Sequence, residues 1–110
     1  MRLAEIAIDN EMVALLSLRA ALIASAGGEP SIEGAVAKLF ASESYVRASE
    51  LCSQIVGRDG LIDGQDPEAV GGGWVNHAAK DSPLTTIYGG TSEIQKNLIA
   101  ERHLGLPRAR

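Results

Sequence analysis

The sequence predicts an all-α fold, an up-down helical bundle with three long helices over 2–26, 31–56 and 92–102. Within each stretch, apolar residues recur mostly every three or four positions, as on one face of an α-helix. Glycine or proline follows each stretch, as is usual where helices end. No part of the chain alternates apolar and polar residues as a half-buried strand does. The 110 residues are expected to form one domain, 1–110.

The expected first helix, 2–26, carries more apolar residues than one stripe holds, and Gly27 and Gly28 end it. Such a helix needs neighbours on more than one side, yet only two other long helices are expected within the chain. The sequence therefore predicts either an oligomer or a chain separated from further helices of its bundle.

The second helix is expected to begin at Ser31, after Pro30, and to end before Gly57. Glycines and prolines then interrupt every pattern, so 57–86 is predicted to be a long loop, with a short helical turn over 75–80. Connections of this length are unusual in a small domain and are often functional.

Composition excludes several classes of protein. Hydrophobic residues make up 45% of the chain and aromatic residues 4%, so an aliphatic core is expected. The net charge is −4 and no cluster of basic residues stands out, which argues against nucleic-acid binding. The single cysteine, Cys52, fits a reducing compartment. No signal peptide or membrane-spanning stretch is evident, so the expected location is cytoplasmic.

The residues alone indicate little catalytic equipment. His77 and His103 lie far apart, without the cysteine or histidine spacing of a metal site. No Gly-x-Ser-x-Gly nucleophile turn is present. The glycines at 57–60 and 71–73 lack the spacing of a Walker or a dinucleotide-binding loop.

One segment is more informative than the rest: a diglycine turn, Gly89-Gly90, leads into the last helix. Glycine removes the Cβ atom and leaves backbone N–H groups accessible to a ligand. The helix is predicted to start at Ser92, where Ser92 and Gln95 match a capping box. Free N–H groups and the dipole at a helix N-terminus favour anionic groups.

The segment 87–108, Ile-Tyr-Gly-Gly-Thr-Ser-Glu-Ile-Gln through Leu-Pro-Arg, resembles the carboxy-terminal signature of acyl-CoA dehydrogenases. The resemblance implies part of the family's carboxy-terminal four-helix domain, FAD as cofactor and an acyl-CoA thioester as substrate. It places Tyr88 and Gly90 beside the acyl-CoA and the N–H of Gly89 on the thioester carbonyl. It also places the following three residues near the flavin: Thr91, Ser92 and Glu93.

Gly89 occupies the position where much of that family carries its catalytic glutamate, so the resemblance implies a base elsewhere. Some branches place the glutamate on the domain's first helix, which has no counterpart here. In steroid-catabolic branches two different half-subunits pair, and one of them lacks the base. The residues of the segment 87–108 favour this branch. Glu93 and Glu101 are weaker candidates, because the first suits the helix dipole and the second suits an ion pair with a nearby arginine.

A second motif, Gln54-Ile-Val-Gly-Arg-Asp-Gly60, resembles the family's Gln-Ile-Leu-Gly-Gly-x-Gly. The resemblance implies that Gln54 and Gly57 contact the flavin's pyrophosphate and adenosine side across a subunit interface. Arg58 departs from the pattern. It either pairs with a phosphate or excludes the flavin by its bulk.

The sequence thus predicts the carboxy-terminal part of an FAD-dependent acyl-CoA dehydrogenase, inactive by itself. The resemblance implies electron-transfer flavoprotein as acceptor and a homo- or hetero-oligomer of dehydrogenase subunits. The alternative is a non-catalytic helical module that pairs with a catalytic subunit, an interpretation that Gly89 and Arg58 support. An acyl-CoA oxidase, which uses oxygen as acceptor, would have the same residues.

Overall fold

The structure is a computed structural model that describes residues 2–108. It contains four α-helices: α1 (Arg2–Ser25), α2 (Ser31–Val56), α3 (Trp74–Thr85) and α4 (Ser92–Arg102). Two short 3₁₀ helices, η1 (Gly57–Leu61) and η2 (Val70–Gly73), lie between α2 and α3. No strand is present within residues 2–108, so the prediction of an all-α fold is confirmed.

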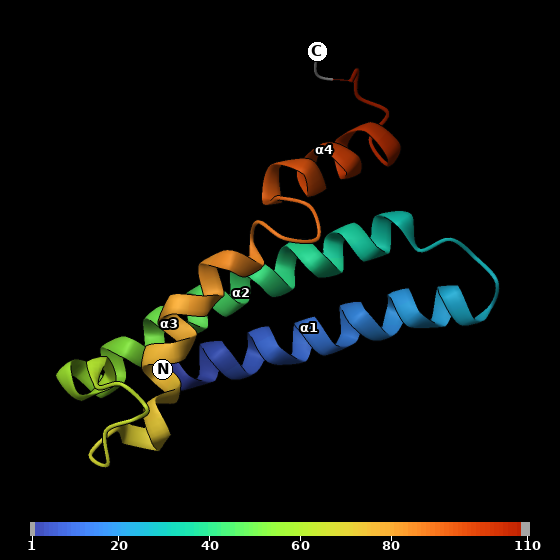
Figure 1. Ribbon diagram of the computed structural model, residues 1–110. Coiled ribbons are helices and arrows are strands. Elements are labelled where there is room, and N and C mark those ends of the chain that lie inside the picture. Colours follow the sequence, from blue (N-terminus) through green and yellow to red (C-terminus); the bar gives the residue numbers. More distant parts are fainter. Residues whose placement is uncertain (1, 109–110) are drawn as a thin grey trace.

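The first two helices form a long antiparallel hairpin (Figure 1). Gly27, with φ of +80°, lets the chain leave α1, and the N–H of Gly28 bonds the carbonyl of Ile23 at 3.0 Å. Near the other end of the hairpin, Arg47 of α2 donates to the carboxylate of Asp9 at 3.0 Å. This part of the fold follows the sequence prediction to within one residue.

The second helix is the centre of the molecule: α1, α3 and α4 each pack on α2, and within residues 2–108 they do not pack on one another. Small side chains allow these contacts. The hydroxyls of Ser49 and Ser82 lie 2.8 Å apart in the buried contact between α2 and α3. The buried residues are small or polar, with only three hydrophobic ones among those described: Ala35, Val75 and Ala78. These three are aliphatic, as the composition predicts. Most of the larger aliphatic side chains stay partly or wholly exposed, because α1, α3 and α4 each pack on α2 alone.

The prediction that 57–86 is a loop is wrong over its second half, where α3 spans twelve residues. The sequence reading allowed only a helical turn over 75–80. Pro83 lies in the last turn of α3, so the helix continues for only two residues beyond the point at which the prolyl ring disturbs it. The glycines that suggested a loop lie just before the helix, not within it.

Those glycines, Gly71, Gly72 and Gly73, all have positive φ, between +57° and +76°. Their backbone passes very close to Gly64: a Cβ on Gly73 would lie 2.4 Å from the Cα of Gly64. Glycine is therefore required here both for its backbone conformation and for its lack of a side chain. The contact folds the segment between η1 and η2 back onto the start of α3.

The molecule is open and elongated, with extents of 51 × 33 × 27 Å and a radius of gyration of 16.9 Å. A compact chain of this length would have a radius of about 13 Å. Its accessible surface is 7541 Å², whereas about 5,800 Å² is typical for this mass. The outer face of α1 carries six exposed large hydrophobic side chains: Leu3, Ile8, Met12, Leu15, Leu18 and Leu22.

The expectation from the sequence that the first helix needs partners on more than one side agrees with this exposed face. Among the helices of residues 2–108, none has the length and apolar character needed to cross a bilayer.

Candidate functional site

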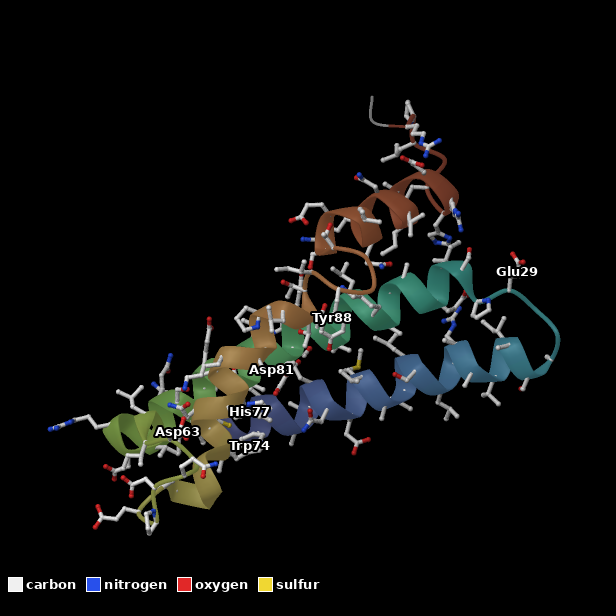
Figure 2. The ribbon with its side chains drawn as sticks, viewed as in Figure 1. Glu29, Asp63, Trp74, His77, Asp81 and Tyr88 are labelled. Carbon is white, nitrogen blue, oxygen red and sulfur yellow. The ribbon has the colours of Figure 1, made fainter. Side chains whose placement is uncertain are left out.

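The diglycine turn, defined as Thr86–Thr91, connects α3 to α4. It begins where the N–H of Tyr88 bonds the carbonyl of Leu84 at 3.1 Å, and it closes where the N–H of Ser92 bonds the carbonyl of Thr86 at 3.0 Å. Figure 2 shows Tyr88 beside the middle of α2, and its side chain is 63% exposed. The turn therefore presents Tyr88 at the surface while both of its ends are fixed.

Both glycines of the turn have positive φ, +66° at Gly89 and +93° at Gly90. A Cβ on Gly90 would lie 2.6 Å from Nε2 of Gln95, so a side chain there would displace that amide. A Cβ on Gly89 would meet only the Cε of Lys38, at 4.0 Å. A side chain at position 90 would be strained by the positive φ and would displace the end of Gln95, whereas one at position 89 would be strained by the positive φ alone.

The carbonyl groups of the two glycines are bonded, whereas their N–H groups are free within residues 2–108. Nε2 of Gln95 donates to the carbonyl of Gly89 at 3.0 Å, and the ammonium of Lys38 donates to the carbonyl of Gly90. For the N–H groups of Gly89 and Gly90, no acceptor is found within residues 2–108. The arrangement leaves two backbone donors available to a ligand.

The start of α4 differs in detail from the sequence prediction. Its N-cap is Thr91, whose hydroxyl accepts from the N–H of Ile94 at 3.3 Å. The predicted capping box of Ser92 and Gln95 is wrong, because the helix cap lies one residue earlier and Gln95 bonds Gly89 instead. The turn and the helix are therefore coupled through Gln95.

Two side chains at this helix start are chemically notable. The hydroxyl oxygen of Ser92 is buried and lacks any hydrogen-bond partner within the described chain, although buried polar groups are nearly always paired. The pKa of Glu93 is lowered by hydrogen bonding to its own backbone N–H and to Thr91, with a contribution from Lys96. Glu93 is thus an ionised, exposed carboxylate, and the hydroxyl of Ser92 is a buried donor without an acceptor in the described chain.

The turn borders two cavities. A polar cavity of about 530 Å³ is lined by Arg47, Thr86, Ile87, Lys96 and their neighbours, and includes the whole start of α4: Thr91, Ser92 and Glu93. An apolar cavity of about 280 Å³ is lined by Lys38, Tyr45, Thr85, Tyr88 and small residues of α2. Burial, with Asp81 and Tyr88 nearby, raises the pKa of Tyr45, so its hydroxyl stays neutral at physiological pH.

The second predicted motif lies elsewhere on the molecule. Gln54, Gly57 and Arg58 are all exposed and lie at the carboxyl end of α2. Lys38 of the same helix touches the diglycine turn, and Gln54 follows it by sixteen residues, or about 24 Å along the helix axis. The structure therefore places residues 88–93 in one site and residues 54–58 in a separate region of the molecule.

Lys38 is the site residue that sequence reasoning missed. It lies 52 residues before Gly90 in a helix of small side chains, and no local pattern marks it. Of the two carboxylates considered as bases, Glu101 forms an ion pair with Arg108 at 3.9 Å, as the sequence suggested.

Comparison with known proteins identifies the family. The model of the carboxy-terminal domain of acyl-CoA dehydrogenases matches residues 1–104. The chain belongs to the acyl-CoA dehydrogenase family. The mitochondrial short-chain specific acyl-CoA dehydrogenases of human and rat are 37% and 35% identical to it, over 100 and 99 residues. Each alignment covers 90% of this chain and 22% of the relative, so the chain spans less than a quarter of these dehydrogenases.

A relative from Mycobacterium tuberculosis and two solved structures are also similar. Acyl-CoA dehydrogenase IpdE1 of Mycobacterium tuberculosis is 39% identical over 75 residues, covering 66% of this chain and 18% of that protein. The ChsE4-ChsE5 complex from the same organism contains a chain that is 29% identical, with a TM-score of 0.89 over 98% of this chain and 28% of that chain. The Tcur3481-Tcur3483 steroid acyl-CoA dehydrogenase, 22% identical with a TM-score of 0.92 over the same shares, has the same fold.

Proposed function

We propose that the chain is the carboxy-terminal helical part of an FAD-dependent acyl-CoA dehydrogenase and that its diglycine turn binds the thioester end of an acyl-CoA. The observation that carries the proposal is the pattern of hydrogen bonds in the turn. Side chains occupy the carbonyl groups of Gly89 and Gly90, and the N–H groups of both residues are free.

Free N–H groups at this turn suit the chemistry of α,β-dehydrogenation. Removal of the α-proton from a thioester places negative charge on the thioester oxygen. A fixed backbone donor at that oxygen stabilises the enolate-like transition state more than the ground state. The N–H of Gly89 is the proposed donor, and Tyr88 and Gly90 would line the thioester end of the substrate.

The start of α4 fits a flavin by its donor set. The buried hydroxyl of Ser92 lacks a partner, and the polar cavity beside it is also lined by Thr91 and Glu93. These three residues would hold FAD, which accepts the β-hydrogen as hydride when bound. Lys96 and Arg47 line the same cavity and would favour an anionic group there.

Gln54, Gly57 and Arg58 are proposed as a second flavin contact, made across an interface with another subunit. Their distance from the turn along α2 supports two separate contacts and not one pocket. Arg58 is exposed at the end of the helix, where its guanidinium is accessible to a phosphate.

The catalytic base is proposed to lie outside this chain, because position 89 is glycine. Glu93 is poorly suited to the role, since a lowered pKa makes a carboxylate a weaker base. Glu101 is held in an ion pair on α4. The chain alone is therefore expected to be inactive.

The test is to purify the chain with its dehydrogenase subunit partners and to record flavin absorbance before and after anaerobic addition of acyl-CoA. We expect a yellow complex that acyl-CoA bleaches. Gly90→Ala should slow bleaching, because alanine is strained at this positive φ and its Cβ displaces the amide of Gln95 that bonds Gly89. Gly34→Ala, in the first turn of α2 with nothing within 4 Å of the added atom, should not.

The competing proposal, a non-catalytic module that stabilises a partner subunit, is favoured by Gly89 and by the exposed face of α1. A colourless, tightly associated complex that acyl-CoA leaves unchanged would support it and contradict the first proposal. Reduction of electron-transfer flavoprotein during turnover is expected for a dehydrogenase, and oxygen consumption for an oxidase. A cytoplasmic location stays a prediction, tested by fractionation.

A further inference from the structure

The ammonium group of Lys38 makes a long-range contact with the diglycine turn. Lys38 lies on α2, is half-buried, and donates to the carbonyl of Gly90. No carboxylate lies within ion-pair distance of its nitrogen in the described part of the chain. The carbonyl of Gly90 is thus the partner that this charged group has within residues 2–108. A hydrogen bond from a charged donor is about twice as strong as one between neutral groups.

The contact fixes the orientation of one peptide unit. In a trans peptide the C=O and N–H groups point in opposite directions. Because the carbonyl of Gly90 points at Lys38, the N–H of Thr91 points away from it. Gln95 fixes the preceding unit in the same way: its amide holds the carbonyl of Gly89, and the N–H of Gly90 points away from Gln95.

We propose that Lys38 is a positioning residue for the diglycine turn. Its bond to the carbonyl of Gly90 holds the N–H of Thr91 toward the flavin and limits rotation of the neighbouring peptides, which carry the N–H groups of Gly89 and Gly90. The inference rests on the proposed function for its catalytic consequence. The turn needs such a contact for two reasons. Gly89 and Gly90 have no side chains to hold them, and left-handed glycines exchange easily between conformations.

A selectively labelled sample tests the contact directly. Gly90-Thr91 is the only Gly-Thr pair in the sequence, so labelling glycine with carbonyl ¹³C and threonine with ¹⁵N yields one cross-peak that joins the two residues. The experiment uses the labelled chain in complex with unlabelled subunit partners. In Lys38→Met the carbonyl resonance of Gly90 should move upfield, and the order parameter of Thr91 should fall from about 0.85 to below about 0.6.

Two further variants separate positioning from general stability. Lys38→Arg keeps a charged donor and should keep the cross-peak near its original place. Lys80→Met removes an exposed lysine of α3 that pairs with Asp63 at 3.7 Å, and should leave the cross-peak unchanged. A cross-peak that stays in place in Lys38→Met, or that moves equally in Lys80→Met, overturns the proposal.

Kinetics then test the catalytic consequence. In the flavin-containing complex, Lys38→Met should slow bleaching at saturating acyl-CoA by about tenfold or more, since small displacements of a positioned group have large effects on rate. The concentration for half-saturation should change little, and Lys38→Arg should recover most of the rate. An unchanged rate in Lys38→Met overturns the catalytic part. If acyl-CoA does not bleach the unmodified complex, the proposed function fails and the cross-peak alone decides the role of Lys38.

Discussion

Gly73 and Gly71 show how differently two neighbouring glycines with left-handed φ constrain the chain. A Cβ on Gly73 would lie 2.4 Å from the backbone of Gly64, whereas a Cβ on Gly71 meets nothing within 4 Å. Both have positive φ, so alanine at either position is strained. Only at Gly73 does a backbone clash add to the strain.

We therefore expect Gly71→Ala to lower the free energy of unfolding by about 1–2 kcal/mol, the cost of a left-handed alanine. Gly73→Ala should lower it by at least about 3 kcal/mol, because the segment from 62 to 73 must also move. Urea denaturation followed by circular dichroism measures both. Equal losses in the two variants would contradict the close approach of Gly64 and Gly73.

The buried pair of Ser49 and Ser82 gives a second residue-level prediction. Ser82 is 1% exposed, and its hydroxyl is bonded to that of Ser49. Ser49→Ala leaves this hydroxyl unpaired in the contact between α2 and α3, at a cost of about 1–3 kcal/mol. The double variant with Ser82→Ala should cost no more than Ser49→Ala alone. Additive losses in a thermal-unfolding cycle would show that the two hydroxyls do not interact.

At the level of elements, Thr91 decides where α4 begins. Its hydroxyl accepts from the N–H of Ile94, so Thr91→Val should reduce stability by about 1 kcal/mol while Thr91→Ser should not. The same hydroxyl helps to lower the pKa of Glu93, so that pKa should rise toward its ordinary value of 4.5 in Thr91→Val. Carboxyl carbon shifts followed against pH measure this change. An unaltered titration in Thr91→Val would remove Thr91 as a cause.

The sign of the pH effect follows from the direction of the shift. The pKa of Glu93 is lower in the folded chain, so the unfolded chain binds its proton first as pH falls. The contribution of ionised Glu93 to the free energy of unfolding is therefore complete above pH 4.5 and is lost as pH falls below that value. Glu93→Gln should therefore unfold with a smaller dependence on pH in this acidic range. A larger dependence would contradict the lowered pKa.

The elements that sequence reasoning found are those whose signals are local. Helices α1, α2 and α4 follow from their periodicity and from the glycines that close them. Helix α3 was largely missed, because its prolyl residue and the preceding glycines outweighed a weak apolar pattern. The turn 88–90 was found from Gly89 and Gly90, but the two side chains that bond its carbonyls were not. Lys38 reaches the turn only through tertiary packing, and Gln95 was assigned to the wrong bond.

At the level of the whole molecule, the exposed face of α1 predicts association. The surface exceeds that of a compact protein of this mass by more than the roughly 800 Å² that each partner buries in a typical interface. We expect the isolated chain to self-associate or to bind hydrophobic dyes. The double variant Ile8→Glu and Leu15→Glu should reduce both self-association and dye binding, with no loss of the helical circular-dichroism signal.

The control for this prediction is Ser17→Glu with Asn10→Glu, which places two acidic residues on exposed polar positions of the same helix. It adds the same charge and leaves the apolar face intact, so association should persist. Light scattering gives the molar mass of each variant. A monomeric unmodified chain without dye binding would contradict the prediction.

The arrangement of three helices around α2 also bears on how motion is distributed. Because α1, α3 and α4 each pack on α2 and their backbones do not contact one another within residues 2–108, detachment of one need not loosen the next. Amide exchange should then show that α1, α3 and α4 open independently of one another and that α2 is the most protected helix. Opening of α1 would thus leave the bonds that Lys38 and Gln95 make to the diglycine turn intact, so the candidate site would keep its geometry while another part of the same small chain moves.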